Sequence, residues 1–126
     1  MPSLNRVQLI GNLGRDPEAR FTANGKKYAT FTLAVNRSWK SATGEKQEHT
    51  DWFIVNAWGK LGDFAVEYVK KGRLVLLEGR LQTDRWEDTK GETHYRTTVV
   101  ARSIQLLDPR PEEPEEVEVS IEEASE

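Results

Sequence analysis

Nine residues decide how the rest of this chain folds: Trp52-Phe53-Ile54-Val55-Asn56-Ala57-Trp58-Gly59-Lys60. Aromatic and β-branched side chains dominate the run and a glycine closes it, which predicts a β-strand. Because side chains alternate between the two faces of a strand, Phe53, Val55 and Ala57 share one face, which suits a hydrophobic core. The opposite face carries the indoles of Trp52 and Trp58. A core needs only one face, so the tryptophan face is left for another role.

The composition excludes several classes of protein. A chain of 126 residues favours a single domain. It contains no cysteine, which excludes disulfides, thiolate zinc sites, iron–sulfur clusters and cysteine nucleophiles. No apolar run is long enough to cross a membrane as a helix, and the N-terminus lacks the pattern of a secretory signal. We therefore expect a soluble, cytoplasmic protein.

Charge divides the chain into two parts. Residues 1–108 hold 17 basic and 13 acidic side chains, whereas residues 109–126 hold one arginine and eight glutamates. A mildly basic body indicates contact with a polyanion, and a solvated surface with a solubilising tail is the alternative that charge alone leaves open. Three prolines and the glutamates predict that residues 109–126 form a disordered acidic tail after a domain at 1–108.

The hydrophobic pattern predicts a mainly β domain with one helix. Strands are expected at about residues 4–13, 27–37, 51–58, 73–86 and 95–107. Helical spacing relates five apolar residues that follow the third strand: Leu61, Phe64, Ala65, Tyr68 and Val69. Two polar segments, 40–50 and 87–93, are expected to be hairpin loops.

This order of elements predicts the architecture. Gly79 interrupts the fourth expected strand and indicates a strong bend, as barrels require. Long, bent strands with a single short helix predict a small, nearly closed barrel. The helix between the third and fourth strands matches the five-stranded OB-fold.

The four tryptophans form a candidate binding surface. Trp39, Trp52, Trp58 and Trp86 all lie outside the predicted core face. Basic residues lie close to them in the predicted arrangement: Arg37, Lys40, Lys60, Lys71 and Arg85. Bases stack on indoles with about 1–3 kcal/mol per base and little dependence on base identity, while lysine and arginine bind phosphates. The combination predicts sequence-tolerant binding of a single-stranded nucleic acid.

Other interpretations of the aromatic residues stay open at this point. Tryptophans are commonly half-buried in a core or an interface. An oligosaccharide also stacks on aromatic rings, although carboxylates and amides beside the rings would suit it better than lysine and arginine. An OB-fold module that assembles proteins and has lost DNA binding is a further alternative.

An enzyme has little support in the sequence. His49 and His94 show no metal-ligand spacing, and the chain has no phosphate-binding Gly-x-x-x-x-Gly-Lys-Ser/Thr loop. Asp84, Glu87 and Asp88 could together hold a metal for nuclease chemistry, but solvated carboxylates in a hairpin are the simpler explanation. We therefore expect no catalytic residue, no metal and no cofactor.

With these residues placed, the chain resembles the bacterial single-stranded DNA-binding proteins of replication. The resemblance covers about residues 4–107, and its motifs are Val7–Glu18, Phe31–Ala34 with Ser38-Trp39, Thr50–Trp52, Trp58–Leu61, Tyr68–Gly72, Glu78–Leu81 and Arg85-Trp86. It implies an OB-fold subunit, a homotetramer with DNA wrapped around its outside, and a role in replication, recombination and repair.

The resemblance also implies roles for single residues. Trp39, Trp52 and Trp86 match stacking tryptophans of the family, and Trp58 stands where a relative carries phenylalanine. Three basic residues match positions that contact phosphate: Lys60, Lys71 and Arg85. Ile54 departs from the pattern, because relatives can carry an arginine there.

The tail departs further from the family. Relatives commonly end in an acidic tip closed by proline and phenylalanine, which docks onto replication and repair enzymes. Here the last residues are Ile121-Glu122-Glu123-Ala124-Ser125-Glu126. These residues are acidic, as such docking requires, but they lack the aromatic anchor. We therefore expect the glutamates to compete electrostatically with DNA for the basic face.

Overall fold

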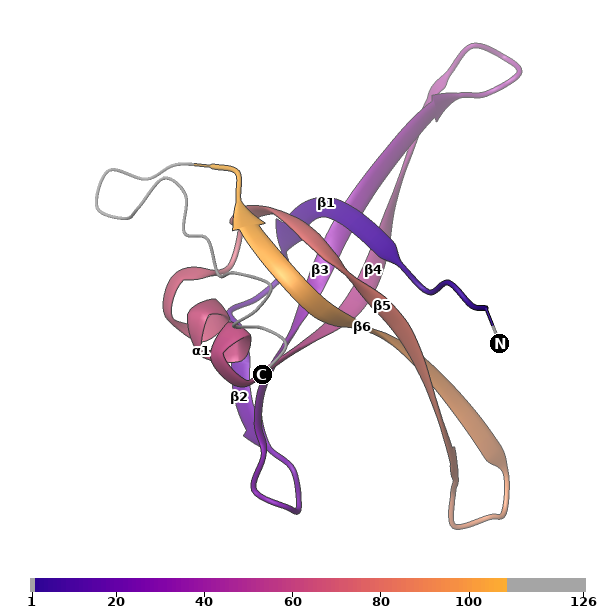
Figure 1. Cartoon of the computed structure of the whole chain (residues 1–126). Helices are drawn as coiled ribbons and strands as arrows, with labels where there is room; N and C mark the ends of the chain where they lie inside the picture. Colours follow the sequence, from indigo (N-terminus) through magenta and orange to yellow (C-terminus); the bar gives the residue numbers. More distant parts are fainter. Residues whose placement is uncertain (1, 109–126) are drawn as a thin grey trace.

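The computed structural model describes residues 2–108. The predicted acidic tail, 109–126, lies outside the described residues, and so does the partner docking expected of it. The elements in chain order are β1 (Val7–Leu13), β2 (Glu18–Phe21), β3 (Lys27–Lys40), β4 (Lys46–Trp58), α1 (Gly59–Tyr68), β5 (Leu74–Glu87) and β6 (Thr93–Leu106) (Figure 1).

The sheet closes into a barrel. Its strands follow the order β1-β5-β6-β4-β3-β2, and β1 also pairs with β3. The β1–β3 contact joins Asn12 to Ala34 and Leu13 to Leu33, while β4 and β6 meet in a short parallel pair. Five strands therefore form a closed ring, with β2 attached to β3 outside it. The predicted mainly β, five-stranded barrel is confirmed.

The expected strand count needs one correction. The short strand β2 was not predicted, because all four of its residues are exposed and no alternation marks it. It pairs with β3 through backbone hydrogen bonds, for example Arg20 opposite Tyr28. The helix α1 therefore lies between β4 and β5 in chain order, rather than between the third and fourth strands.

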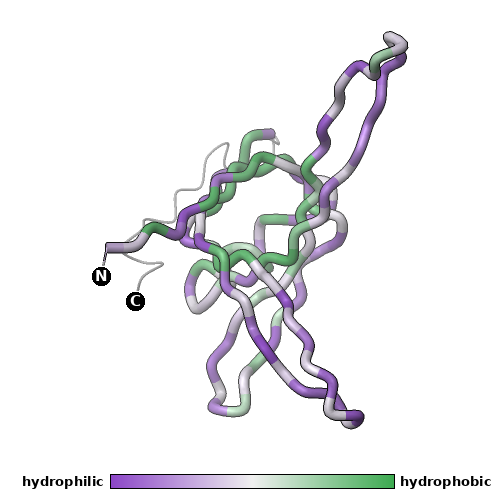
Figure 2. The backbone as a smooth tube through the Cα atoms, turned by 90° about the vertical axis from the view of Figure 1, so that its right-hand side faces the viewer, coloured by the Kyte–Doolittle hydropathy of each residue, from purple (hydrophilic) through white to green (hydrophobic). Residues whose placement is uncertain are grey.

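The core lies inside the barrel, beneath α1. Val55 and Ala57 are fully buried, as the sequence predicts, and Phe53 is partly buried and packs against the core. Leu61, Phe64 and other residues of the helical stripe pack against these strands, which confirms the stripe as core packing. Figure 2 shows the hydrophobic segments gathered around the barrel.

The expected bend at Gly79 is present. The β5–β6 register shifts between Glu78 and Gly79, which marks a β-bulge or a similar irregularity. A Cβ atom on Gly79 would collide with the backbone carbonyl of Val100. The close approach of the two backbones at this point explains why the position holds glycine.

Two long hairpins project from the barrel (Figure 1). We name residues 36–50 the β3–β4 arm and residues 83–97 the β5–β6 arm. Cα pairing along the first continues to Lys40 and Lys46, so the prediction of a loop over 40–50 is wrong except for residues 41–45. Backbone pairing needs no apolar alternation where both faces meet water, which is why the sequence pattern missed it. The second turn spans 88–92, close to the predicted 87–93.

None of the described residues forms a helix that is both long and apolar enough to cross a membrane.

Candidate nucleic-acid interface

The register of β3 and β4 defines one outer face of the barrel. Residues directly opposite each other in an antiparallel pair point to the same side. Trp52 lies opposite Ala34, Ile54 opposite Thr32, and Trp58 opposite Tyr28. The Trp52 side chain is 59% exposed at one end of this surface. We call the β4 residues Trp52, Ile54, Asn56 and Trp58, with their β3 neighbours, the outer face.

Trp58 is on the outer face, but one side of its ring is occupied. Its indole stacks on Tyr28, with ring centroids 4.6 Å apart and planes inclined by 30°. The side chain is half-buried, so it offers less surface for a base than Trp52 does. Arg20, on β2, lies opposite Tyr28, on β3. Arg20, Tyr28 and Trp58 therefore form a row of one cation and two aromatic rings across three neighbouring strands.

Trp86 stacks on a residue that the sequence analysis did not select. The Trp86 and His94 rings lie 5.5 Å apart with planes inclined by 25°. Nε2 of His94 is 2.7 Å from Oδ2 of Asp88. The hydrogen bond with His94, followed by those from the backbone N–H groups of Glu92 and Lys90, lowers the pKa of Asp88. Asp88 therefore ties the His94 ring to the turn that closes the β5–β6 arm.

Trp39 and Arg37 lie together, but on the other side of their arm. Arg37 is opposite His49 and Trp39 is opposite Gln47, and this register continues the core face rather than the outer face. The Arg37 guanidinium lies 5.1 Å from the centroid of the Trp39 ring. Both predicted site residues are therefore exposed, but they do not share a face with Trp52.

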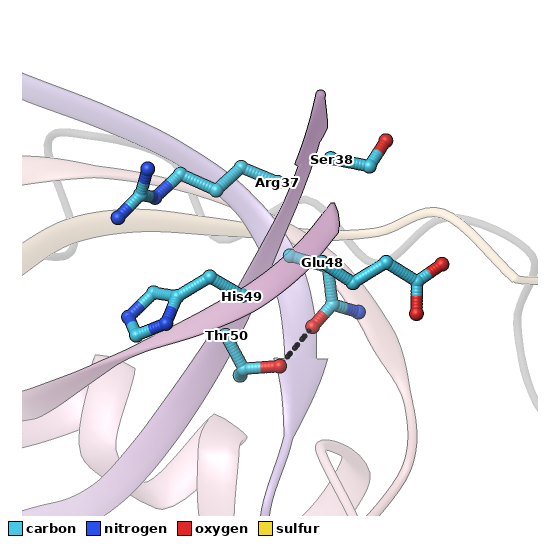
Figure 3. A pocket seen from close by; sticks show the side chains of 6 residues that line it. Arg37, Ser38, Glu48, His49 and Thr50 are labelled. Carbon is cyan, nitrogen blue, oxygen red and sulfur yellow. Dashed lines mark hydrogen bonds between the residues drawn. The ribbon is translucent and has the colours of Figure 1, made fainter. Parts of the chain in front are cut away.

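An aspartate joins the charged groups of the β3–β4 arm. Arg37 Nε lies 3.1 Å from one carboxylate oxygen of Asp51, and His49 Nε2 lies 3.2 Å from the other. Figure 3 shows Arg37 and His49 on one side of the arm, with Ser38 and Glu48 directed away from them. The pocket drawn there has a volume of about 250 Å³ and polar walls. Arg37 and His49 thus share the Asp51 carboxylate as a partner.

The other predicted basic residues are spread around the domain. Lys60 lies in the first turn of α1, and Lys71 follows its end, where the Lys71 backbone N–H donates to Asp16 at 2.7 Å. Arg85 lies opposite Tyr95, so it is on the other face of the β5–β6 arm from Trp86. The structure therefore gathers Trp52 and Trp58 on one surface and leaves Lys60, Lys71 and Arg85 on separate elements.

A groove connects the outer face to the β5–β6 arm. It has a volume of about 200 Å³ and is lined by Arg20, Tyr28, Thr30, Ile54, Asn56, Asp84, Arg96 and Thr98. Asp84 pairs with Arg96 across β5 and β6, and Trp86 pairs with His94 two residues further along the arm. These two pairs are on the same face of the arm. The pair between them, Arg85 and Tyr95, is on the opposite face. Trp86 therefore shares a continuous surface with Ile54 and Asn56.

Sequence reasoning missed Tyr28, His94, Arg20 and Arg96 because no local pattern distinguishes them. Each becomes relevant only through a partner on another strand. The one available signal for Tyr28 was its position in the alternation of the second expected strand, on the side opposite Phe31.

The acidic residues considered for a metal do not assemble as a group. Asp84 Oδ1 accepts a hydrogen bond from Gln82 at 3.2 Å. Within residues 2–108, Asp88 instead lies near Glu92 and His94, with possible ligand atoms all within 4.8 Å of one another. Because Asp88 already accepts hydrogen bonds from the turn and contacts His94, the group is explained by the turn itself.

Comparison with known proteins agrees with this geometry. The family model described as "Single-strand binding protein family" matches residues 4–107. "Single-stranded DNA-binding protein 1" of Chlorobaculum tepidum is 50% identical over 105 residues, which are 82% of this chain and 65% of that protein. The aligned part thus spans slightly less than two thirds of that relative.

A solved structure shows a similar fold. The structure named "Plasmodium falciparum SSB complex with ssDNA" superimposes with a TM-score of 0.72 at 33% sequence identity, covering 79% of this chain and 88% of that one. A family match over most of the barrel, a half-identical relative and a shared fold lead to one conclusion. The chain belongs to the single-strand binding protein family.

Proposed function

We propose that this protein binds single-stranded DNA without sequence preference and protects it during replication, recombination and repair. The observation that carries the proposal is Trp52, an indole 59% exposed on the outer face. A base that stacks on an exposed indole gains a contact worth about 1–3 kcal/mol. Family membership supports the same ligand, and so does the similar solved structure, which is a complex with single-stranded DNA.

The predicted site residues divide by role in this proposal. Trp39, Trp52 and Trp86 stack on bases, and Trp58 contributes the exposed side of its Tyr28-backed ring. Phosphates are bound by the four basic residues of the prediction: Arg37, Lys60, Lys71 and Arg85. Trp39 and Trp52 lie on opposite faces of the β3–β4 pair, so a strand that contacts both would reach across the edge of this pair.

Tryptophan fluorescence tests the proposal directly. Adding oligothymidine at low salt should quench the emission strongly, because the exposed indoles become stacked. For each phosphate contact, the logarithm of the binding constant should fall by about 0.7 for every tenfold increase in salt concentration. Unchanged emission at low salt, with the protein folded by circular dichroism, would reject single-stranded DNA as the ligand.

We also propose that the protein assembles as a homotetramer. Strand β1 pairs with β5 over Val7–Asn12, but its other edge pairs only at Asn12 and Leu13 within the described chain. An open strand edge favours pairing with another chain. Ile10, on this strand, is 55% exposed. Light scattering with and without long oligothymidine should give the tetramer mass, and a monomer mass in both would refute it.

The proposal includes no catalytic step, and it places the protein with DNA in the cytoplasm. His49 and His94 each contact an aspartate, an arrangement explained by structure alone. Incubation with single-stranded DNA and magnesium should leave the DNA intact. Cleavage that disappears in an Asp84→Ala variant would instead favour a nuclease. Replication and repair proteins stay predicted partners of the acidic residues 109–126.

A further inference from the structure

The groove between the outer face and the β5–β6 arm lies between two aromatic stacks. Tyr28, which stacks on Trp58, lines the groove at one end. At the other end, Asp84 and Arg96 lie one pair before the stacked rings of Trp86 and His94. A strand whose bases stack on both Trp58 and Trp86 would span this groove.

The groove contains two arginines with different surroundings. Arg20 lies 3.2 Å from the carboxylate of Glu18. Arg96 is exposed and forms no ion pair with another residue of the described chain. The single carboxylate lining the groove is that of Asp84, the cross-strand neighbour of Arg96, which accepts a hydrogen bond from Gln82. Arg96 is therefore the cation in the groove that has a neighbouring carboxylate but forms no ion pair within residues 2–108, and a phosphate would compete with Asp84 for it.

A buried hydroxyl gives independent support for a ligand. Thr98 lines the groove and is 5% exposed, yet its Oγ1 has no hydrogen-bond partner among residues 2–108. Buried polar atoms are nearly always hydrogen-bonded, so an exception calls for an explanation. The hydroxyl oxygen itself is buried, so a ligand in the groove would supply the missing partner only after the side chains over it shift.

We propose that Arg96 provides the central cation of the DNA-binding face and binds a backbone phosphate in the groove, with the Thr98 hydroxyl donating to the same segment of the strand. Ile54 lines the same groove and leaves its floor uncharged. This inference rests on the proposed binding of single-stranded DNA.

The test measures the salt dependence of oligothymidine affinity. Arg96→Gln should reduce the slope of log affinity against log salt by about 0.7 and weaken binding about eightfold at 50 mM salt, since one phosphate contact is lost. Arg102→Gln is the matched control, because it removes the same charge from an exposed residue of the same strand. An equal change in salt slope and affinity in the Arg96→Gln and Arg102→Gln variants would overturn the proposal.

A rescue variant tests whether the two positions serve one phosphate. Ile54→Arg added to Arg96→Gln should restore the lost slope of about 0.7, because the new guanidinium enters the same groove. A slope that stays low in this double variant, with the fold intact by circular dichroism, would also overturn the proposal.

The role of the Thr98 hydroxyl is tested by measuring the stability and the DNA affinity of one variant, because only the affinity should fall. Thr98→Val removes a buried unsatisfied group, so the melting temperature of the free protein should rise or stay constant. Its affinity for oligothymidine should fall about threefold or more, as one hydrogen bond to the strand is lost. Unchanged affinity would remove Thr98 from the site. If the unmodified protein itself failed to bind oligothymidine, the proposed function would fail and not only the role of Arg96.

Discussion

The indole of Trp52 lies directly against Gly14. A Cβ atom on Gly14 would come within 2.6 Å of Cζ3 of Trp52 and 2.8 Å of Oγ1 of Thr32. The Gly14 backbone is held in place, because its N–H donates to the Thr32 carbonyl at 3.0 Å. A side chain at position 14 must therefore displace the exposed indole rather than the strand, and this makes Gly14 a means of moving Trp52 without removing it.

Gly14→Ala should weaken oligothymidine binding by about tenfold, within the range for one lost base stack. The melting temperature should change little, since the group displaced is an exposed side chain. Fluorescence titration and thermal unfolding measure the two effects. Gly79→Ala is the contrasting variant: its Cβ meets the Val100 backbone, so it should destabilise the fold by about 1–3 kcal/mol. Normal binding by Gly14→Ala would show that the position of Trp52 is unimportant.

His94 should hold Trp86 ready for stacking. His94→Ala removes the ring behind the indole, and affinity should fall by about 0.5–1.5 kcal/mol, the range for an aromatic pair. His94→Phe keeps a flat ring and should retain most of the affinity. Adding His94→Ala to Trp86→Ala should have no further effect, because the two residues act as a unit. Additive losses in this double variant would mean that His94 contacts DNA on its own.

The buried Arg73 should make the fold sensitive to acid. Its side chain is fully buried, with Nε 2.8 Å from Oδ1 of Asp108. Burial raises the pKa of Asp108, but the hydrogen bonds from Arg73 and from the Leu74 backbone outweigh it and lower the pKa overall. A lowered carboxyl pKa contributes stability above the unfolded value of about 3.9, and this stability is lost as pH falls through the folded pKa.

Asp108→Asn should therefore lower the free energy of unfolding at pH 7 by about 1–3 kcal/mol, because Arg73 loses its counter-charge. The difference from the unmodified protein should shrink below about pH 4. Denaturant unfolding at several pH values measures this. Asp63→Asn, which breaks the exposed pair with Lys27, is the control and should cost about 0.5 kcal/mol or less. Equal costs at pH 7 would contradict a structural role for the Arg73–Asp108 pair.

Asp51 should compete with DNA for Arg37. Asp51→Asn removes the carboxylate that contacts both Arg37 and His49, so oligothymidine should bind about two- to fivefold more tightly, with a steeper salt dependence. Glu48→Gln is the matched control, because Glu48 lies on the other side of the same arm. If Glu48→Gln strengthened binding equally, the effect would be one of net charge and not of Arg37.

The core of this protein was predictable from short-range pattern. Alternation with a period of two identified Val55 and Ala57 as buried, and helical spacing identified the stripe beginning at Leu61. These predictions succeeded because the side-chain direction within one strand or helix depends only on local backbone geometry. The same patterns missed β2 and the arms, where both faces of the strands meet water and no alternation is required.

The sequence by itself determined a mainly β barrel, its core face and the tryptophans left outside that core. Only the tertiary structure decided which of those tryptophans share a surface and what stands behind them. Trp58 meets Tyr28, Trp86 meets His94, and Arg96 enters the groove beside Ile54, each across strands that are distant in the chain. These neighbours depend on strand register and on closure of the barrel, and a local pattern contains no information about either.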